Sequence, residues 1–188
     1  VAVCGTHGKT TTACFTLRLL QTLGGDPAWC IGGHTEAMGN VADGSGRGPL
    51  VVEADESDGT LVEFRPEHAI ILNIEEEHLD HYRDFAAIAE VFRALVRQTS
   101  GHVVWCADDA GARVVCGGEA RAVSYGCSES ADFTATAMVL ANGRTVSEEI
   151  QNLDTAPYVV GFKPAPGQTR LSRADWDVFT AKLKAAVA

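Results

Sequence analysis

Short apolar runs alternate with amphipathic or polar stretches along the first two thirds of the chain. Six runs have the length of buried strands: residues 1–4, 28–31, 50–54, 69–73, 102–106 and 122–125. Between them, residues 10–23 and 84–98 carry apolar side chains every three or four positions, which predicts helices, and a shorter helix is predicted from Asp108-Asp109. Strands that alternate with helices predict an α/β fold, a mostly parallel sheet with helices on both faces.

Each long helix has a predicted buried face and a recognisable end signal. The first helix is predicted to stop at Gly24-Gly25. Its predicted buried face comprises Phe15, Leu19, Leu20 and Leu23. The second helix begins with Asp84 as its cap. Its apolar stripe comprises Phe85, Ile88, Phe92 and Leu95.

The pattern changes beyond Asp132. Residues 133–140 predict a strand, and a turn at Asn142-Gly143 would make it part of a small antiparallel β extension. Residues 151–169 contain three prolines and predict an irregular segment. Ser172 and Asp175 resemble a capping box for a last helix. We therefore predict one domain over residues 1–145 and a separate C-terminal segment over residues 146–188.

The charge balance argues against nucleic acid as a partner. The chain has 15 Lys and Arg against 25 Asp and Glu, a net charge of −10, and we find no basic patch. An anion site would therefore have to be local and built from helix-end amides and a metal ion.

Apolar content and cysteine spacing bear on location. No apolar run has the length of a bilayer span, so we predict no membrane partner and a cytoplasmic location. The six cysteines lack CxxC spacing, which favours buried free thiols over zinc sites or disulfides. Because an apolar strand starts at residue 1 without an initiator Met, we expect a fragment of a longer protein.

A glycine-rich loop with a lysine lies between the first predicted strand and helix. It reads Gly5-Thr6-His7-Gly8-Lys9-Thr10-Thr11-Thr12 and is shorter than the full phosphate-loop pattern. Glycines let backbone amides approach a phosphate closely, and the helix start adds positive partial charge. We predict that Lys9 reaches the β- and γ-phosphates of ATP and that the Thr10 hydroxyl contacts Mg²⁺. The alternative is a tight turn with a solvent-exposed lysine.

Acidic residues follow two further strands. Glu53 lies near the end of the predicted strand 50–54 and is followed by Asp55, Glu56 and Asp58. Magnesium prefers carboxylate oxygens, so Glu53 is a candidate ligand, whereas Asp58 fits a solvated turn. Ligands of open α/β sheets bind at the carboxyl ends of the strands, where these groups would meet.

The third element is Asn73-Ile74-Glu75-Glu76-Glu77-His78-Leu79-Asp80. A neutral imidazole can bind a metal, so His78 is a candidate ligand beside these carboxylates. Of the other histidines, His7 lies within the phosphate loop and His34 in the glycine-rich stretch 32–48, which we expect to be a long loop. The remaining three, His68, His81 and His102, fit structural or solvated roles.

Taken together, these segments resemble the central ATP-binding domain of the Mur ligase family, a P-loop NTPase-like fold. The resemblance rests on GTHGKTTT, on GGH with a later Asn, on VVEADESDGTL and on LNIEEEHLDHY, and it covers roughly Val1 to Phe133. The EADESD run is most similar to the branch of the family that joins L-alanine to UDP-N-acetylmuramate. A murein-peptide ligase would usually have Tyr at the position of Ser57.

The resemblance implies a ligase of peptidoglycan synthesis that forms an acyl phosphate with ATP. It implies that Lys9, Glu53 and His78 are catalytic and that Thr10, Glu53 and His78 serve Mg²⁺ directly or through water. The implied ATP-binding residues are Gly5, Thr6, His7, Gly8, Lys9, Thr10, Thr11 and Asn73. Asn73 and Asp80 would organise the ion's surroundings, and His34 and Asn40 would face the nucleotide-sugar substrate.

Two departures from the family pattern leave other interpretations open. Glu77 stands where the family usually has Asp, and residues 146–188 do not match the family's His-Asn-containing continuation. The N- and C-terminal domains of the family enzymes are missing as partners, so we expect no complete reaction from this chain alone. The alternatives are a non-catalytic remnant whose last helix docks onto a partner, and a ligase of the folylpolyglutamate synthase type.

Overall fold

The computed structural model describes residues 1–33, 39, 41–128, 130–134, 138–141 and 144–147. Contacts divide the chain into two compact units, Val1–Ser124 and Tyr125–Ala188. The described helices are α1 (Lys9–Thr22), the 3-10 helix η1 (Thr60–Glu63), α2 (Phe85–Gln98) and α3 (Ala110–Cys116). None of the described helices combines the length and the apolarity needed to cross a bilayer. The predicted boundary after residue 145 stays a prediction.

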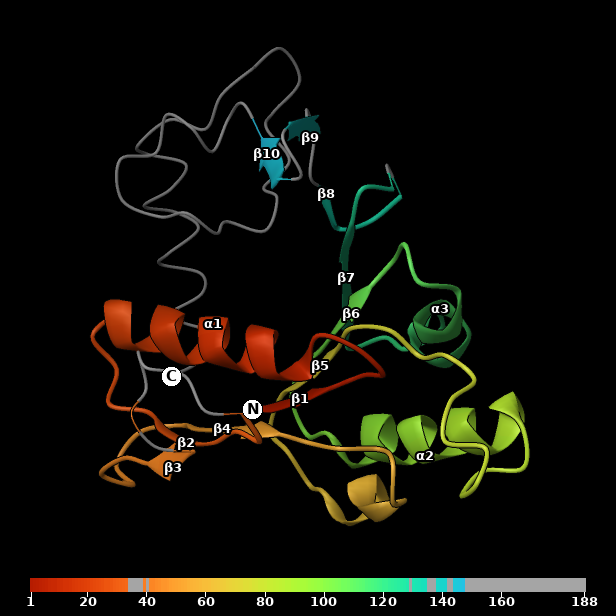
Figure 1. Cartoon of the computed structure of the whole chain (residues 1–188), viewed down its shortest axis with the longest axis horizontal. Helices are drawn as coiled ribbons and strands as arrows, with labels where there is room; N and C mark the ends of the chain where they lie inside the picture. The colour runs from red at the N-terminus through yellow and green to blue at the C-terminus, as the bar shows by residue number, and fades with distance from the viewer. Residues whose placement is uncertain (34–38, 40, 129, 135–137, 142–143, 148–188) are drawn as a thin grey trace. The chain divides into compact units, whose positions relative to one another are not determined.

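The strands of the first unit form one sheet around β1 (Figure 1). They are β1 (Ala2–Cys4), β2 (Ala28–Cys30), β3 (Ala42–Asp43), β4 (Leu50–Glu53), β5 (Ala69–Ile71), β6 (Val103–Cys106) and the first three residues of β7 (Ala122–Gly126), a strand that continues into the second unit. Their order is β3-β2-β4-β1-β5-β6-β7. The pairs β2·β4, β4·β1, β1·β5 and β5·β6 are parallel, and β3 pairs antiparallel with β2. The predicted mostly parallel sheet is therefore confirmed.

The register of the central strands brings three loops to one edge of the sheet. Ala2 of β1 is opposite Val52 of β4 and opposite Ala69 of β5. Because the three strands are parallel and in register, the segments that follow them start side by side. These segments are the glycine-rich loop, the acidic run after Glu53 and the loop that begins at Leu72.

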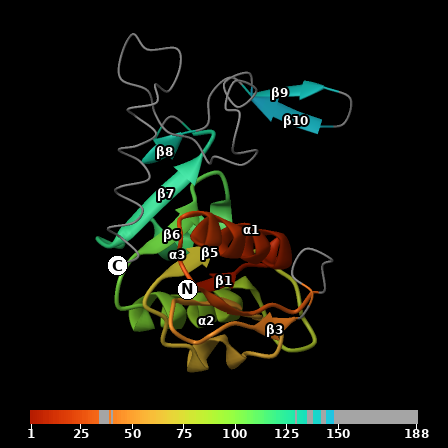
Figure 2. The same cartoon turned by 90° about the vertical axis from the view of Figure 1, so that its left-hand side faces the viewer.

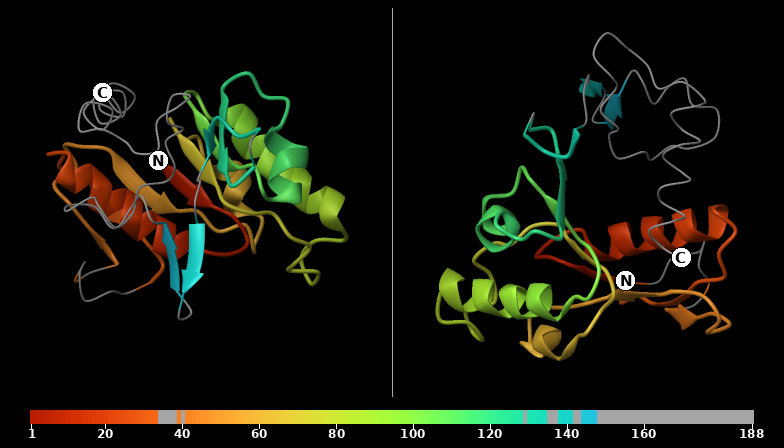
Figure 3. Two further views of the ribbon diagram at one scale, coloured as in Figure 1. Left: turned by 90° about the horizontal axis from the view of Figure 1, so that it is seen from above. Right: turned by 180° about the vertical axis from the view of Figure 1, so that it is seen from behind.

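Helices cover both faces of this sheet. α1 contacts β1 and β4, whereas α2 contacts η1 and α3, and α3 contacts β6. Figures 2 and 3 show α1 and α2 on opposite sides of β1 and β5. The fully buried core between these layers includes Val3, Val51, Ile71, Phe92 and Leu95.

The predicted face of the first helix was only partly right, since Leu20 is buried but Phe15 and Leu19 are not. The buried residues of α1 are Ala13, Leu17 and Leu20, whereas Phe15 is 40% and Leu19 38% exposed. The apolar residues of α1 are spread around much of the helix, so their spacing alone did not define which side packs against the sheet. In α2 three of the four predicted residues, Ile88, Phe92 and Leu95, are buried, and Phe85 at the helix start is half-buried.

Two further strand predictions need correction. Residues 32–48 are not wholly irregular, because Ala42 and Asp43 form the short edge strand β3. Within residues 133–140 the structure describes two strands: β8 (Phe133–Thr134) pairs in parallel with the end of β7, and β9 (Met138–Ala141) pairs antiparallel with β10 (Arg144–Ser147). The antiparallel extension is therefore the β9·β10 pair. The predicted turn residues 142–143, the last helix, His34 and Asn40 lie outside the described residues.

Candidate functional site

The glycine-rich loop joins β1 to α1 in a conformation that requires glycine. Gly5 has a φ of 135°, and a Cβ there would lie 2.9 Å from the backbone oxygen of Asn73. Gly8 has a φ of 82° and precedes α1 without a side chain that could cap it. The first backbone amides of a helix have no partner within the helix, so a start without a side-chain cap leaves them available to an anion.

Asn73 fixes this loop from the end of β5. The His7 N–H donates to Asn73 Oδ1 at 2.7 Å, and Asn73 Nδ2 donates back to the His7 carbonyl at 3.1 Å. The Glu75 N–H donates to Thr6 Oγ1 at 2.9 Å, and the Thr6 side chain is buried. Asn73 and Thr6 therefore hold the two loops together through backbone groups.

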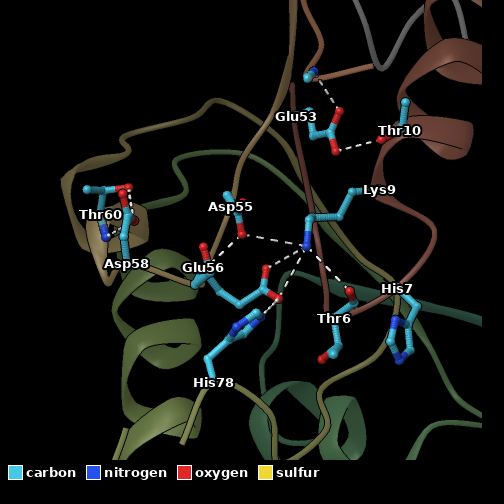
Figure 4. Close-up of polar contacts among 12 residues, drawn as sticks. Thr6, His7, Lys9, Thr10, Glu53, Asp55, Glu56, Asp58, Thr60 and His78 are labelled. Carbon is cyan, nitrogen blue, oxygen red and sulfur yellow. Dashed lines mark hydrogen bonds and ion pairs between the residues drawn. The ribbon is translucent and has the colours of Figure 1, made fainter. Parts of the chain in front are cut away.

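Lys9 points inward and binds a buried carboxylate. Its Nζ lies 3.1 Å and 3.2 Å from the two carboxylate oxygens of Glu56 and 3.4 Å from the Thr6 carbonyl (Figure 4). The Lys9 side chain is 14% exposed and that of Glu56 only 2%. Asp55, which is exposed, lies 3.7 Å from the same ammonium. The alternative of a solvent-exposed lysine is therefore wrong.

His78 approaches the same carboxylate from the third loop. Its Nε2 lies 3.7 Å from Glu56 Oε1. Among the described non-glycine residues, His78 is the one with a positive φ, 55°. Its carbonyl accepts the N–H groups of His81 and Tyr82, each at 2.9 Å, which holds this unusual backbone in place. Left-handed backbone at a non-glycine residue is unfavourable and is often found at functional sites.

Glu53 accepts two hydrogen bonds that are separate from the contacts of Glu56 with Lys9 and His78. Its Oε1 accepts the Thr10 hydroxyl at 2.8 Å, and its Oε2 accepts the Gly32 N–H at 2.8 Å. Figure 4 shows Glu53 directed towards Thr10, the residue that follows Lys9. A hydroxyl and a carboxylate oxygen this close are a donor set that suits Mg²⁺. Thr10 and Glu53 therefore fit the ion that the sequence implies.

A second group of possible ligands lies at the outer side of the loop. His7 Nε2 is 3.4 Å from Glu77 Oε1 and 3.8 Å from Glu75 Oε2. One ligand atom from each of the three residues lies within 4.8 Å of the others, close enough for one cation. The side chains of His7, Glu75 and Glu77 are 59%, 55% and 43% exposed, and exposed acidic groups beside a histidine also occur without a metal ion.

The charge of this region affects nearby pKa values. Burial acts to raise the pKa of Asp55, but its bond from the Ser57 N–H and the nearby Lys9 outweigh this, so the pKa is lowered. The pKa of Tyr82 is raised by burial and by the charge of Glu56. Burial and Glu56 also raise the pKa of the Cys4 thiol. Lys9 therefore opposes a local excess of negative charge.

Other predicted residues lie further from these contacts. Thr11 is exposed on the first turn of α1, and Asp80 is exposed as well. Asp58 accepts from the Thr60 N–H and hydroxyl within its own turn, as a solvated turn residue would. His68 and His102 stack with ring centres 5.8 Å apart, which is a structural role.

Sequence reasoning missed the roles of Glu56 and Asp109. Glu56 was one of four acids in a run, and nothing local distinguished it. Asp109 Oδ1 accepts both the Ala112 N–H of α3, at 2.6 Å, and the Ile74 N–H, at 3.1 Å. The helix cap was a possible signal for Asp109, but its bond to Ile74 spans 35 positions and is visible only in the fold.

The fold and these contacts define a class of protein. A parallel sheet whose first strand leads through a glycine loop and a lysine into a helix is the architecture of P-loop-like nucleotide-binding domains. The family is equally clear: residues 3–159 match the model of the Mur ligase middle domain. The chain belongs to this family.

Relatives in this family share the described region. A UDP-N-acetylmuramate–L-alanine ligase of Renibacterium salmoninarum is 43% identical over 139 residues, which are 70% of this chain and 30% of that protein. The enzyme of the same name from Salinispora arenicola is 44% identical over 144 residues, 73% of this chain and 28% of its own length. This chain therefore spans less than a third of these relatives.

Solved structures agree on the fold. The UDP-N-acetylmuramate–alanine ligase of Thermotoga maritima superposes with a TM-score of 0.62 at 31% identity, covering 71% of this chain and 30% of that one. The UDP-N-acetylmuramate:L-alanyl-γ-D-glutamyl-meso-diaminopimelate ligase of Neisseria meningitides gives 0.61 at 27% identity, over 77% of this chain and 52% of that one.

Proposed function

We propose that this chain is the ATP-binding central part of a UDP-N-acetylmuramate–L-alanine ligase, an ATP-dependent acid–amino-acid ligase of cell-wall peptidoglycan synthesis. In the proposed reaction, a substrate carboxylate oxygen attacks the γ-phosphorus of ATP and ADP leaves. The amino group of L-alanine then attacks the acyl carbon of the resulting acyl phosphate, loses a proton and expels phosphate. The other domains of such an enzyme would have to supply the binding sites for the two substrates. A cytoplasmic location is part of the proposal.

The contacts around Lys9 support the phosphate-binding part of this proposal. Lys9 is the first residue of α1, and its ammonium would neutralise charge on the β- and γ-phosphates. Asn73 and Thr6 hold the loop in shape before any nucleotide arrives, so little reorganisation is needed.

Three residues would hold magnesium. Thr10 and Glu53 already lie together, and His78 would act directly or through water. The bound ion would supply further positive charge at the transferred phosphoryl group. Glu53 is additionally held by the Gly32 N–H, which fixes the carboxylate that faces Thr10.

One observation carries the proposal: a lysine directed into a carboxylate-lined site at the meeting point of three parallel strands, in a chain of this family. The specific choice of L-alanine ligase rests on the identities of 43% and 44% to the two bacterial relatives.

Calorimetric titration with Mg·ATP tests the nucleotide part. Wild type should bind Mg·ATP, and Thr10→Val, which keeps the shape of the side chain but removes the hydroxyl, should weaken binding. Thr11→Val on the same helix turn is the matched control, although Thr11 is itself a predicted contact, and its effect should be smaller. Wild-type protein that shows no heat at millimolar Mg·ATP would refute the proposal.

A domain exchange tests whether this chain supports the complete reaction when the Renibacterium domains supply the substrate sites. The middle domain of the Renibacterium enzyme is replaced by residues 3–159 of this chain, and ADP release is measured with UDP-N-acetylmuramate and each amino acid in turn. We expect release that depends on L-alanine. Nucleotide binding without any turnover in a folded chimera would favour the non-catalytic remnant instead.

A further inference from the structure

Glu56 is buried far more deeply than an acidic residue normally is. It is 1% exposed, and no other Asp, Glu, Lys, Arg or His among the described residues is classed as buried. A carboxylate removed from water is unfavourable unless a cation and hydrogen bonds compensate for it. In the described part of the chain its ion-pair partners are Lys9 and His78.

The backbone of Glu56 is held independently of these two partners. Its carbonyl accepts the Tyr82 hydroxyl, from the loop before α2, and the Gly59 N–H at 3.1 Å. The loop therefore presents the carboxylate from a fixed position. Lys9 lies 47 positions before it in sequence, and His78 belongs to another loop, so Glu56 links all three strand-end loops.

We propose that Glu56 is a positioning residue that keeps Lys9 and His78 in place for the triphosphate and stays paired with Lys9 after nucleotide binds. This inference rests on the proposed function. An ammonium has three N–H groups, and its contact with the Thr6 carbonyl is long at 3.4 Å, so one N–H can turn to a phosphate oxygen. Releasing Glu56 altogether would leave a buried charge unpaired, which opposes a complete exchange of partners.

Asp55 offers a matched control for the charge itself. It lies 3.7 Å from the same ammonium, but its side chain is 59% exposed. Glu56→Gln and Asp55→Asn each remove one negative charge beside the phosphate site. If these acids only repelled phosphate, both substitutions would strengthen Mg·ATP binding. If Glu56 positions Lys9, Glu56→Gln should weaken binding clearly, whereas Asp55→Asn should have little effect or strengthen it.

Calorimetric titration of the full chain with Mg·ATP is the test. We expect Glu56→Gln to weaken binding about tenfold, the size of one lost charge-assisted contact. Asp55→Asn should leave the affinity within about threefold of wild type, or strengthen it, because an exposed charge is screened. A Glu56→Gln protein that binds as tightly as wild type or more tightly would overturn the inference.

A second readout does not need a stable Glu56 variant. In ¹⁵N-labelled nucleotide-free wild type, the Lys9 ammonium should give a slowly exchanging signal, assigned by its loss in Lys9→Arg, and Asp55→Asn should retain it. Absence of this signal in wild type would overturn the inference. A wild type that shows the signal but binds no Mg·ATP would refute the proposed function while leaving the Lys9–Glu56 contact in place.

Discussion

Replacing Lys9 should destabilise the protein even without nucleotide. The substitution Lys9→Met keeps most of the apolar stem and removes the ammonium, which leaves the Glu56 carboxylate, 2% exposed, with His78 Nε2 at 3.7 Å. Removing one partner of a buried ion pair lowers the free energy of unfolding by about 3–5 kcal/mol. The nearby imidazole can compensate in part, so we expect the lower end, about 3 kcal/mol.

The opposite substitution should be milder. Glu56→Gln leaves Lys9, which is 14% exposed, able to reach water and Asp55 at 3.7 Å. We expect a loss of about 1 kcal/mol, the size of one net hydrogen bond. The double variant Lys9→Met/Glu56→Gln should also lose only about 1 kcal/mol, because no charge is left unpaired. The cycle therefore predicts a coupling free energy of roughly 3 kcal/mol.

Urea unfolding followed by far-ultraviolet circular dichroism measures these values. With a slope of about 2 kcal/mol per molar urea, the single Lys9 variant should unfold at a concentration about 1.5 M lower than wild type. If the effects of the two single substitutions add in the double variant, the buried pair is not coupled and the reasoning fails. The same data also show whether a nucleotide-binding defect of a Lys9 variant was measured on folded protein.

Three further predictions concern other parts of the fold. Asp109→Ala should lower the free energy of unfolding by about 2–4 kcal/mol, because α3 loses its cap and the buried Ile74 N–H loses its acceptor. Asp109→Asn should lower it less, and urea unfolding measures both variants. The Ala87 N–H and Arg83 lower the pKa of Asp84 in the folded protein below its usual 3.8. Ionised Asp84 therefore stabilises the folded state fully above pH 3.8, and this stabilisation is lost as the pH falls through the lower pKa of the folded protein. Asp84→Asn, an equally good cap at any pH, should therefore show a flatter acid-unfolding profile, and equal profiles would contradict this. Burial and Glu119 raise the pKa of Cys116 to about 12, so its thiol should not react with maleimide in the folded protein. After brief treatment at pH 7.5, mass spectrometry should find the exposed Cys30 labelled, and Cys116 should be labelled only once the protein is unfolded.

The cysteine prediction from sequence was only partly right. Cys4 and Cys116 are buried, but Cys30 and Cys127 are exposed, and none of the six is paired with another in a disulfide. Cys30 lies in β2, where its side chain alternates to the side opposite Trp29. The residues of this short strand near the edge of the sheet are apolar although one of its faces is open to solvent, so the sequence suggested more burial than the fold provides.

Local signals determined much of this protein from the sequence alone. Runs of apolar residues predicted the parallel strands, because a strand covered on both faces needs apolar side chains at nearly every position. The glycines around Lys9 predicted the turn into α1, because Gly5 and Gly8 adopt backbone angles that other residues avoid. The family was also recognisable, since several motifs occurred in order.

Only the tertiary structure decided which acid meets the lysine. Asp55, Glu56 and Asp58 follow the same strand within four positions, yet Glu56 alone of the three is buried. Outside a regular strand or helix, no periodicity tells which side chain points inward. The direction depends on contacts distant in sequence, such as the Tyr82 hydroxyl on the Glu56 carbonyl and Lys9 on its carboxylate. The sequence could thus locate the site at three strand ends, whereas the packing of those ends selected the carboxylate at its centre.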